Sequence, residues 1–200
     1  MRVLVACEHS GVVRDAFRAQ GHEAWSCDLL SGDRDSKYHM QGDALTIAYL
    51  PDLEGYHVPR WDLLIAHPPC TYLCNSGVRW LHTDPDRWGK LDEACVFFKK
   101  LLDAPIAHIA IENPIPHKYA VERIGQQYTQ IVQPWQHGHG ETKATCLWLQ
   151  GLPELTPTEV VEGRVGRIHR MSPSPERGRQ RSITYTGIAS AMAAQWGGVA

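Results

Sequence analysis

Short apolar runs of strand length alternate with helical segments along most of this 200-residue chain. The runs are at 3–6, 23–27, 61–66 and 107–111. Helices are predicted at 12–20, 86–103 and 188–195, because apolar residues such as Leu91, Cys95 and Phe98 recur at helical spacing. Strands that alternate with helices indicate an α/β fold, a doubly wound, mostly parallel sheet with helices on both faces.

The second half of the chain adds a different pattern. Segments 129–132 and 143–149 are typical of paired strands, joined around the His-Gly-His-Gly turn at 137–140. An earlier polar stretch, 31–41, has little apolar content and is predicted to be a loop outside the core.

Composition narrows the class of protein. The chain is 43% hydrophobic and 21% charged, which is typical of a globular domain, and its net charge of −2 does not indicate a nucleic-acid binder. We find no membrane-spanning run and no signal segment. The six cysteines are spread along the chain, so we expect them to be reduced in a cytosol. We therefore expect one cytoplasmic domain over residues 1–200.

The segment 162–182 is unlike the rest of the chain because it is rich in arginine. Its arginines are Arg164, Arg167, Arg170, Arg177, Arg179 and Arg181. The segment is either a solvated surface loop or an arm that contacts phosphate, since the guanidinium fork matches phosphate geometry. The sequence leaves both interpretations open.

Cys70 follows the buried strand at 61–66 and two stiff prolines, Pro68 and Pro69. Ligands bind at strand ends in open α/β sheets, so a thiol in this place is a candidate nucleophile. His67 or an arginine near the thiol would lower its pKa and favour the reactive thiolate. The alternative is a cysteine that packs as a small apolar residue.

Glu112 ends the strand at 107–111 and begins Glu112-Asn113-Pro114. We expect it two core strands away from Cys70, at the same edge of the sheet. A thiolate that attacks carbon 6 of a pyrimidine needs charge compensation across the ring. A carboxyl group bonded to the ring nitrogen and the amino group supplies that compensation.

Acidic residues also fall where a nucleotide-like cofactor would need them. Asp28 ends the second strand, where a carboxylate can bind ribose hydroxyls, and Asp43 is placed to reach an adenine amino group. The turn formed by Glu8, Ser10 and Gly11 is the one that a cofactor would approach. The alternative is that both aspartates are turn or cap residues.

These motifs together resemble those of the cytosine carbon-5 methyltransferases. Pro69-Cys70-x-x-Leu73-x-x-x-Gly77 is similar to that family's nucleophile motif, and Glu112-Asn113 is similar to its Glu-Asn-Val motif. Asp28 and Asp43 are similar to the family's ribose-binding and adenine-binding carboxylates. The residues Gln133, Gln136 and Lys143 are similar to its Gln-Arg-Arg strand, and Thr186-Gly187-Ile188-Ala189 is similar to its C-terminal cofactor segment.

The resemblance implies a Rossmann-like class I methyltransferase that uses S-adenosyl-L-methionine, with Cys70 adding to carbon 6 of cytosine. It implies catalytic roles for Pro69, Cys70, Glu112 and Asn113. It implies cofactor binding by Glu8, Ser10, Gly11, Asp28, Asp43, Pro68 and Ile188. Substrate binding is expected from Gln133, Gln136, Lys143, Arg177, Arg179 and Arg181. The host would be a bacterial or phage-infected cell.

The sequence departs from this family in two places. Cys7-Glu8-His9-Ser10-Gly11 replaces the family's Phe-x-Gly-x-Gly turn, so a carboxylated derivative of the cofactor stays open. The stretch 150–185 is shorter than the usual target-recognition domain, so the expected form is a minimal one. DNA is the expected substrate, and a free pyrimidine nucleotide such as dCMP is the alternative. A second copy of the chain, in a homodimer, is one way to complete the DNA contacts.

Other interpretations start from other residues. His137, His139 and Cys146 have metal-ligating side chains, but their spacing is more typical of turn and strand residues, so we expect no metal. Tryptophans at 80, 88, 135 and 148 could stack on a base, although we expect Trp148 in the core. A non-catalytic binding module on the same fold also remains open.

Overall fold

The computed structural model describes residues 1–33, 37–49 and 61–199. Within these ranges a seven-stranded sheet has the order β3-β2-β1-β4-β5-β7-β6. The strands are β1 (Arg2–Ala6), β2 (Glu23–Asp28), β3 (His39–Gln41), β4 (Leu63–Ala66), β5 (His108–Pro114), β6 (Gln130–Val132) and β7 (Thr145–Gln150).

The sheet is parallel except at β7. β1 pairs in parallel with β2 and β4, β2 with β3, and β4 with β5, whereas β7 is antiparallel to both β5 and β6. The predicted pairing of the strands near 129–132 and 143–149 is confirmed. Because the first five strands are parallel, their carboxyl ends share one edge of the sheet.

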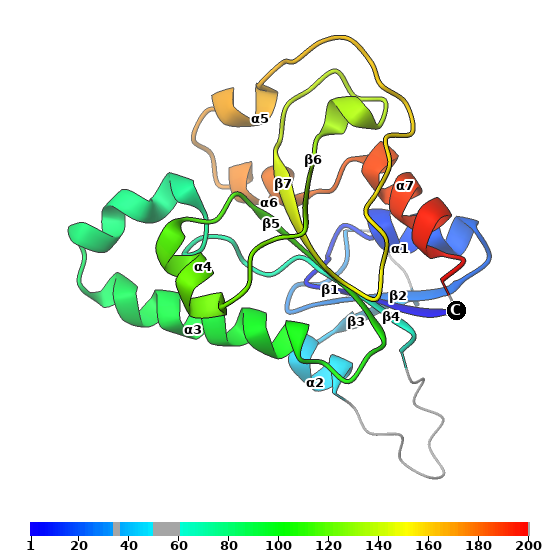
Figure 1. The fold of residues 1–200 in the computed structure, drawn as a ribbon, viewed down its shortest axis with the longest axis horizontal. Coiled ribbons are helices and arrows are strands. Elements are labelled where there is room, and N and C mark those ends of the chain that lie inside the picture. Colours follow the sequence, from blue (N-terminus) through cyan, green and yellow to red (C-terminus); the bar gives the residue numbers. More distant parts are fainter. Residues whose placement is uncertain (34–36, 50–60, 200) are drawn as a thin grey trace.

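Helices cover both faces of the sheet, as predicted (Figure 1). α1 (Val12–Ala19) and α7 (Thr186–Trp196) pack on one face, and α2 (Ala44–Ala48), α3 (Asp86–Leu102) and α4 (Lys118–Ile124) pack on the other. Side chains alternate along β1: Leu4 and Ala6 face the second group, and Val3 and Val5 face the first. The strands therefore need apolar residues at every position, which explains their continuous apolar runs.

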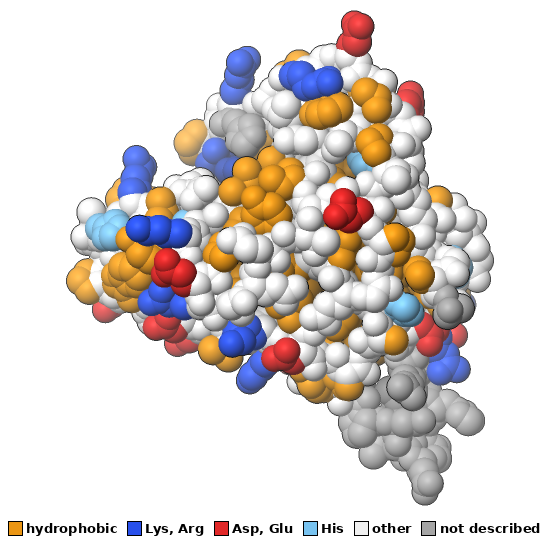
Figure 2. Space-filling view, in the orientation of Figure 1, with side chains coloured by type: hydrophobic (Ala, Val, Ile, Leu, Met, Phe, Trp, Pro, Cys, Tyr) orange, Lys and Arg blue, Asp and Glu red, His pale blue; other side chains and the backbone are white. Residues whose placement is uncertain are grey.

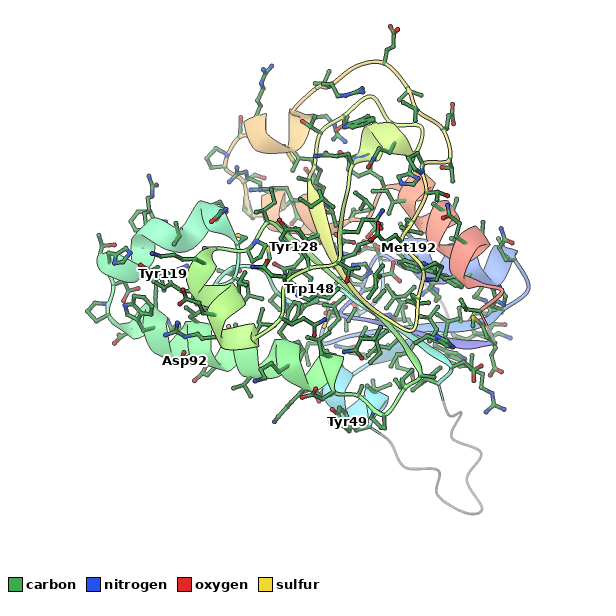
Figure 3. The ribbon with its side chains drawn as sticks, in the orientation of Figure 1. Tyr49, Asp92, Tyr119, Tyr128, Trp148 and Met192 are labelled. Atoms are coloured by element: carbon green, nitrogen blue, oxygen red, sulfur yellow. The ribbon has the colours of Figure 1, made fainter. Side chains whose placement is uncertain are left out.

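The core on the side of α3 and α4 is built around Trp148, which is fully buried, as predicted. Its ring lies edge-on to Phe98 with a centroid separation of 4.9 Å, and its indole nitrogen donates to the carbonyl of Gln126. Met192 belongs to the core on the other side, with α1 and α7 (Figure 3). Satisfying the one polar atom of a buried indole lets its large apolar area stabilise the fold.

Two expectations about the sheet are wrong. The polar stretch 31–41, of which residues 34–36 lie outside the described residues, contains β3, whose residues pair with Ser26, Cys27 and Asp28. An edge strand has one neighbour and needs few apolar side chains, so hydrophobicity alone missed it. β4 and β5 are direct neighbours, with Ala66 beside Ile111, so Glu112 is one strand from the Cys70 loop and not two.

The remaining helices lie near the carboxyl edge of the sheet. They are the 3-10 helices η1 (Asn75–His82) and η2 (Pro134–Gln136), and the short α5 (Arg167–Arg170) and α6 (Arg177–Ser182) of the arginine-rich segment. In Figure 1 the chain from β7 passes over the top of the molecule through α5 and returns through α6 toward the sheet. No helix in the described ranges is long and apolar enough to cross a membrane.

Candidate active site

Residues from three adjacent strands meet at the carboxyl edge of the sheet. Ala6, Ala66 and Ile111 are in register across β1, β4 and β5. The residues that follow them, Cys7, His67 and Glu112, therefore lie side by side at this edge, with Glu112 still within β5, which continues to Pro114. This edge is where a parallel sheet binds its ligands.

The Cys70 loop is held to the next strand. Asn113 donates from Nδ2 to the carbonyl of Pro68 over 3.3 Å, and this bond fastens the Pro-Pro segment to β5. The carbonyl of Cys70 accepts from the amides of Leu73 and Cys74, each at 3.1 Å, which closes a helical turn before η1. The predicted catalytic residue Cys70 thus lies on a loop fastened to β5, the strand that carries Glu112 and Asn113.

Cys70 and Cys74 lie within this turn and share a hydrogen bond. That bond lowers the pKa of Cys74 to about 5 and raises the pKa of Cys70. Cys74 caps η1, where its sulfur also lies 3.1 Å from the hydroxyl of Ser76. The Cys70 thiol therefore donates to the Cys74 sulfur, which favours a thiolate on Cys74 and opposes one on Cys70. Arg181 acts in the opposite direction and favours the Cys70 thiolate, so an arginine, and not His67, is the cation that acts on this thiol.

His67 forms an ion pair with Glu112 instead. Nδ1 of His67 lies 3.0 Å from Oε2 of Glu112, and both side chains are almost fully buried. Burial opposes both charges, but the two groups compensate each other. The carboxylates of Glu112 and Glu8 raise the pKa of His67 above its ordinary value, whereas His67, Lys143 and Thr184 lower the pKa of Glu112 to about 2.

A cavity of about 360 Å³ opens beside this edge, between the strand ends and α3. Its lining combines acids with apolar and aromatic side chains, as sites for nucleosides require. The lining residues are Cys7, Asp28, Leu29, Gly42, Asp43, Ala44, Pro69, Tyr72, Lys90, Glu93, Ala94 and Phe97. Pro69 joins the cavity to the Cys70 loop.

The two predicted cofactor acids, Asp28 and Asp43, both line this cavity. Oδ1 of Asp28 accepts from the amide of Leu30 at 2.9 Å, and Oδ1 of Asp43 caps α2 by accepting from the amide of Thr46 at 2.8 Å. The cap and turn interpretation is thus correct for one oxygen of each residue. Among the described residues nothing bonds Oδ2 of either carboxylate, which leaves two acceptors for ribose hydroxyls and an adenine amino group. These two hydrogen-bond acceptors fit the hydroxyl and amino groups of an adenosyl cofactor.

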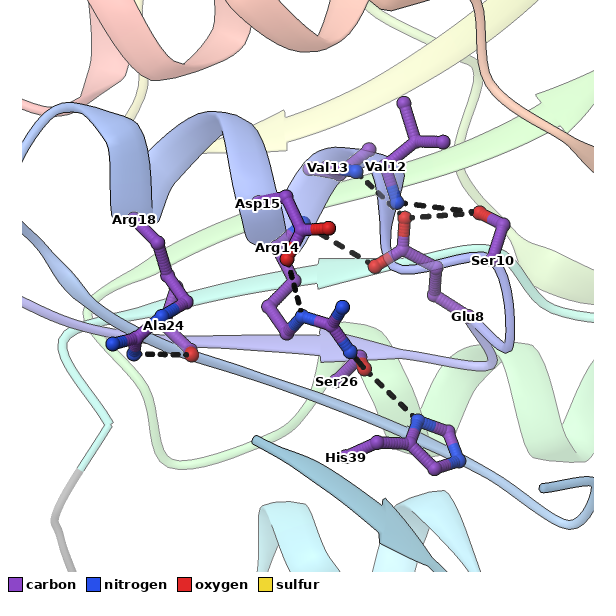
Figure 4. A network of polar contacts seen from close by, with 10 residues as sticks. All are labelled: Glu8, Ser10, Val12, Val13, Arg14, Asp15, Arg18, Ala24, Ser26 and His39. Atoms are coloured by element: carbon purple, nitrogen blue, oxygen red, sulfur yellow. Dashed lines mark hydrogen bonds and ion pairs between the residues drawn. The ribbon is translucent and has the colours of Figure 1, made fainter. Parts of the chain in front are cut away.

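The turn after β1 is organised around Glu8, which is buried (Figure 4). Its carboxylate accepts from the amides of Val13 at 2.7 Å and Arg14 at 3.3 Å, and Ser10 donates to it at 3.4 Å. Burial raises the pKa of Glu8 despite these donors. A side chain thus fills the helix N-terminus that a bound anion would otherwise use. Glu8 and Ser10 bond to each other and to α1, and neither lines the cavity.

Gly11 has a φ of 70°, and a Cβ atom there would meet the guanidinium of Arg14. Arg14 is buried and donates to Ser26, which contacts His39 (Figure 4). The glycine is therefore needed for packing at this turn. Its predicted role in cofactor binding stays a prediction.

The C-terminal segment approaches the site from the other face of the sheet. Ile188 is buried in the core between α7 and β1, away from the residues that line the cavity. Gly187 lies so close to the carbonyl of His137 that a Cβ atom would be 1.8 Å from its oxygen. Nε2 of His139 accepts from the amide of Gly187, and His137 bonds Thr158. The side chain of His139 therefore docks α7, whereas the side chain of His137 holds the segment that follows β7.

Gln133 and Gln136, predicted to bind substrate, hold the backbone before β7. The amide of Gln133 donates to Gln136, and Oε1 of Gln133 accepts from the amide of Lys143 at 3.1 Å. Lys143 donates from Nζ to the carbonyl of Ile183 and adds positive charge near Glu112 and His67. Of these three residues only Lys143 acts directly on the candidate site.

The arginines of α6 lie over the carboxyl edge. Arg181 is close enough to Cys70 to affect its pKa, and Arg179 pairs with Asp33. Nε of Arg177 is buried and has no hydrogen-bond partner among the described residues. Earlier in the same segment, Arg164 stacks over Trp135 and Arg167 pairs with Glu141. Arg177, Arg179 and Arg181 are the arginines predicted to bind substrate, and of these three Arg181 is the one that acts on Cys70.

Aromatic and basic side chains also cover the outer side of η1, α3 and α4. Figure 2 shows Lys and Arg among hydrophobic side chains on this side, at the left of the view. Trp80 is 46% exposed beneath the guanidinium of Arg79, whereas Trp88 packs edge-on against Tyr119. Of the tryptophans considered for base stacking, Trp80 has the most open ring.

Two solved structures resemble this fold. A prophage-encoded E. coli protein assigned as a DNA modification methyltransferase matches 86% of this chain, with a TM-score of 0.51 and 13% sequence identity. The Entamoeba histolytica methyltransferase EhMeth matches 87% of it, with a TM-score of 0.44 and 12% identity. The chain spans 55% and 60% of the lengths of these two proteins. No protein-family model and no curated protein matches the sequence.

The likeness to the prophage protein, together with the strand order, establishes the fold class. The chain has the Rossmann-like fold of class I methyltransferases, as the resemblance implied. An antiparallel β7 lies between β5 and β6. At 13% identity the likeness extends to the fold alone. The chemistry therefore has to be argued from the site.

The His67–Glu112 pair predicts how stability depends on pH. The pKa of Glu112 is lowered in the fold, so its contribution is complete above about pH 4.5 and is lost as the pH falls toward 2. The pKa of His67 is raised, so its contribution is complete below about pH 6.5 and is lost as the pH rises through the raised value.

We expect the stabilisation by this pair to be greatest between about pH 4.5 and 6.5. The difference in Tm between the parent and the His67→Gln variant, measured by calorimetry from pH 4 to 9, should shrink as the pH rises above 6.5. Each kcal/mol of lost stability corresponds to about 2–4 °C at this chain length. A difference that stays constant across this range would contradict the ion pair.

Proposed function

We propose that this protein transfers a methyl group from S-adenosylmethionine to carbon 5 of cytosine in DNA, through a covalent adduct with Cys70. One arrangement carries the proposal: a thiol, a buried carboxylate and an acid-lined cavity meet at one edge of a class I methyltransferase fold. Thiol addition, charge compensation and a methyl donor are the three requirements of this reaction.

The cavity is the proposed cofactor site, with Asp28 holding the ribose and Asp43 the adenine amino group. S-adenosylmethionine, when bound, supplies an electrophilic methyl group on a positively charged sulfur. Pro69 lies both in the cavity lining and next to Cys70, which supports a site where the donor and the base are neighbours. The protein must hold them there while water is kept out.

Cys70 makes carbon 5 reactive. The Cys70 thiol loses its proton to water beside Arg181, and the Cys70 sulfur bonds to carbon 6 while the carbon 5–carbon 6 double bond opens. The electron pair passes into the ring, ring nitrogen 3 takes up a proton, and carbon 5 becomes nucleophilic. After methylation, water removes the carbon 5 proton, the carbon–sulfur bond breaks and the ring nitrogen gives its proton back. Cys70 leaves as a thiolate.

DNA as the substrate is supported by Arg181 of α6, which acts on Cys70 and is positioned to neutralise phosphate charge beside the target base. The target base must leave the helical stack to reach the thiol. The exposed ring of Trp80 and its neighbour Arg79 supply a second surface with stacking and charge on the same side of the molecule as the Cys70 loop.

The test supplies S-adenosylmethionine, labelled on its methyl group, with duplex DNA, single-stranded DNA or dCMP. We expect label in 5-methylcytosine released from DNA, and mass spectrometry of that nucleoside identifies the transferred group as methyl. Label in dCMP alone would contradict DNA as the substrate. A carboxymethyl product, formed only with a carboxylated donor, would contradict S-adenosylmethionine.

Asp28→Ala tests the cofactor site. Removing the ribose acceptor is expected to raise the Kd for S-adenosylmethionine by about 10- to 100-fold, because charged hydrogen bonds contribute about 1.5–3 kcal/mol. Isothermal titration calorimetry measures this directly. Asp103→Ala, at the exposed end of α3 and outside the cavity, is the matched control and should bind as the parent does. Equal affinities of the two variants for S-adenosylmethionine would show that the cofactor does not bind at Asp28.

Arg181→Ala tests the DNA contact. We expect DNA to bind about tenfold more weakly at low salt, and the dependence of log Kd on log salt to fall by about one unit of slope. Fluorescence anisotropy over a salt series measures both quantities. Arg170→Ala, on the same segment but in α5, is the control. An identical salt dependence of log Kd for Arg181→Ala and the parent would show that Arg181 does not contact a DNA phosphate.

A further inference from the structure

His67 stands between two buried carboxylates at the centre of the candidate site. It follows β4 directly, its amide donates to the carbonyl of Ala6, and Nδ1 lies 3.0 Å from Oε2 of Glu112. Both ring nitrogens are buried, and neither forms a hydrogen bond of full geometry with a described residue, so Nδ1 meets Glu112 as an ion-pair contact. The addition of Cys70 to a base does not require such a histidine.

The charges around His67 favour the imidazolium. Glu112 approaches from β5 and Glu8 from the turn after β1, while Lys143, before β7, opposes them. Burial alone would remove the proton, but the two carboxylates outweigh it. Glu112, in turn, keeps its negative charge because His67, Lys143 and Thr184 surround it. The proton of the pair therefore resides on the histidine.

With the proton on His67, Glu112 has no proton to give to the base. Ring nitrogen 3 of cytosine must gain a proton as the thiolate adds to carbon 6, and Glu112 is the group expected to deliver it. A carboxylate with a lowered pKa carries no proton of its own at neutral pH. The nearest proton source in contact with it is His67.

We propose that His67 is a positioning residue that orients Glu112 and holds the proton which Glu112 passes to ring nitrogen 3. This inference rests on the proposed function, because it concerns the same site and the same base. His67 acts through the carboxylate and does not itself touch the substrate.

The proton balance closes over one cycle. As the sulfur–carbon 6 bond forms, the ring electron pair takes a proton from Glu112, and Nδ1 of His67 supplies a proton to the same carboxylate, which leaves a neutral imidazole. When the carbon–sulfur bond breaks, ring nitrogen 3 returns its proton through Glu112 to His67. The carbon 5 proton is separate and leaves with water. His67 thus ends the cycle as an imidazolium.

His67→Gln tests the inference through the pH profile of methyl transfer to DNA. The parent should lose kcat as the pH rises through the raised pKa of His67, because the proton is then absent. The variant should lose about 10²-fold in kcat near neutral pH, with little change in KM for S-adenosylmethionine, and should lack this alkaline decline. His108→Gln, at the opposite end of β5, is the control and should keep the parental profile.

A second measurement does not depend on turnover. NMR titration of ¹⁵N-histidine-labelled protein should give His67 a pKa above that of the exposed histidines, and Glu112→Gln should lower it. A His67 pKa unchanged by Glu112→Gln, or a His67→Gln variant with the parental kcat and pH profile, would overturn the inference while leaving the proposed function intact. A parent that methylates no cytosine would instead overturn the proposed function and this inference with it.

Discussion

Cys70→Ala is expected to lower methyl transfer to DNA by at least about 10³-fold, because no other group can form the bond to carbon 6. Carbon 5 of cytosine has no nucleophilic character until that bond exists. Cofactor binding should be unchanged, because the sulfur is not among the cavity-lining groups. The measurement is single-turnover transfer of labelled methyl groups at saturating cofactor.

Cys95→Ala is the matched control for this variant. Cys95 is buried in α3, and removing its sulfur tests the cost of a truncated cysteine in the core without touching the loop. We expect a small loss of Tm and parental turnover. Parental activity in Cys70→Ala would reject the covalent mechanism, and equal losses in both variants would show a stability effect instead.

Glu112→Gln is expected to lower kcat by about 10²- to 10⁴-fold, the range for removing a group that transfers a proton in the transition state. Glutamine retains the shape and can still bond the base, but it cannot pass a proton from His67. It also leaves the His67 imidazolium without its nearest anion, so His67 becomes neutral at lower pH.

Glu122→Gln, on the exposed side of α4, is the control for this substitution and should keep the parental rate. Circular dichroism and Tm at pH 6 separate a loss of chemistry from a loss of fold. A Glu112→Gln variant with unchanged kcat across the pH range would remove Glu112 from the mechanism.

Much of the sheet could be predicted because its strands are buried on both faces. Continuous apolar runs such as those of β1 and β4 are hard to mistake when helical patterns separate them. β3 was missed because three residues at a sheet edge, with Met40 as the one apolar side chain, leave too weak a hydrophobic signal. The order of the strands, and hence the direct contact of β4 with β5, is a tertiary property that no local pattern encodes.

The sequence predicted which residues form the candidate site, but it did not predict which side chains contact one another there. Cys70, Glu112, Asp28 and Asp43 stand at strand ends, where the alternation of strands and helices already places them. The sequence suggested His67 or an arginine as the cation beside the thiol, and the fold assigns that position to Arg181. Contacts between residues far apart in the chain depend on packing, which the spacing of motifs does not determine.

In the turn after β1, too, the sequence predicted the residues but not their contacts. Glu8, Ser10 and Gly11 stand where a cofactor loop is expected, yet the Glu8 carboxylate bonds the amides at the start of α1 (Figure 4). A carboxylate in that position repels the carboxyl end of a cofactor. We expect the amino-acid end of the cofactor to be held by groups outside this helix N-terminus.

The covalent adduct can be observed directly with DNA that carries 5-fluorocytosine at the target position, because fluorine cannot leave carbon 5 as a proton does. We predict that S-adenosylmethionine and this DNA form a denaturation-resistant complex, and that peptide mass spectrometry places the modified base on Cys70. The Cys70→Ala variant should form none. Methyl transfer to cytosine without any trapped complex, or a base attached to a cysteine other than Cys70, would contradict the account.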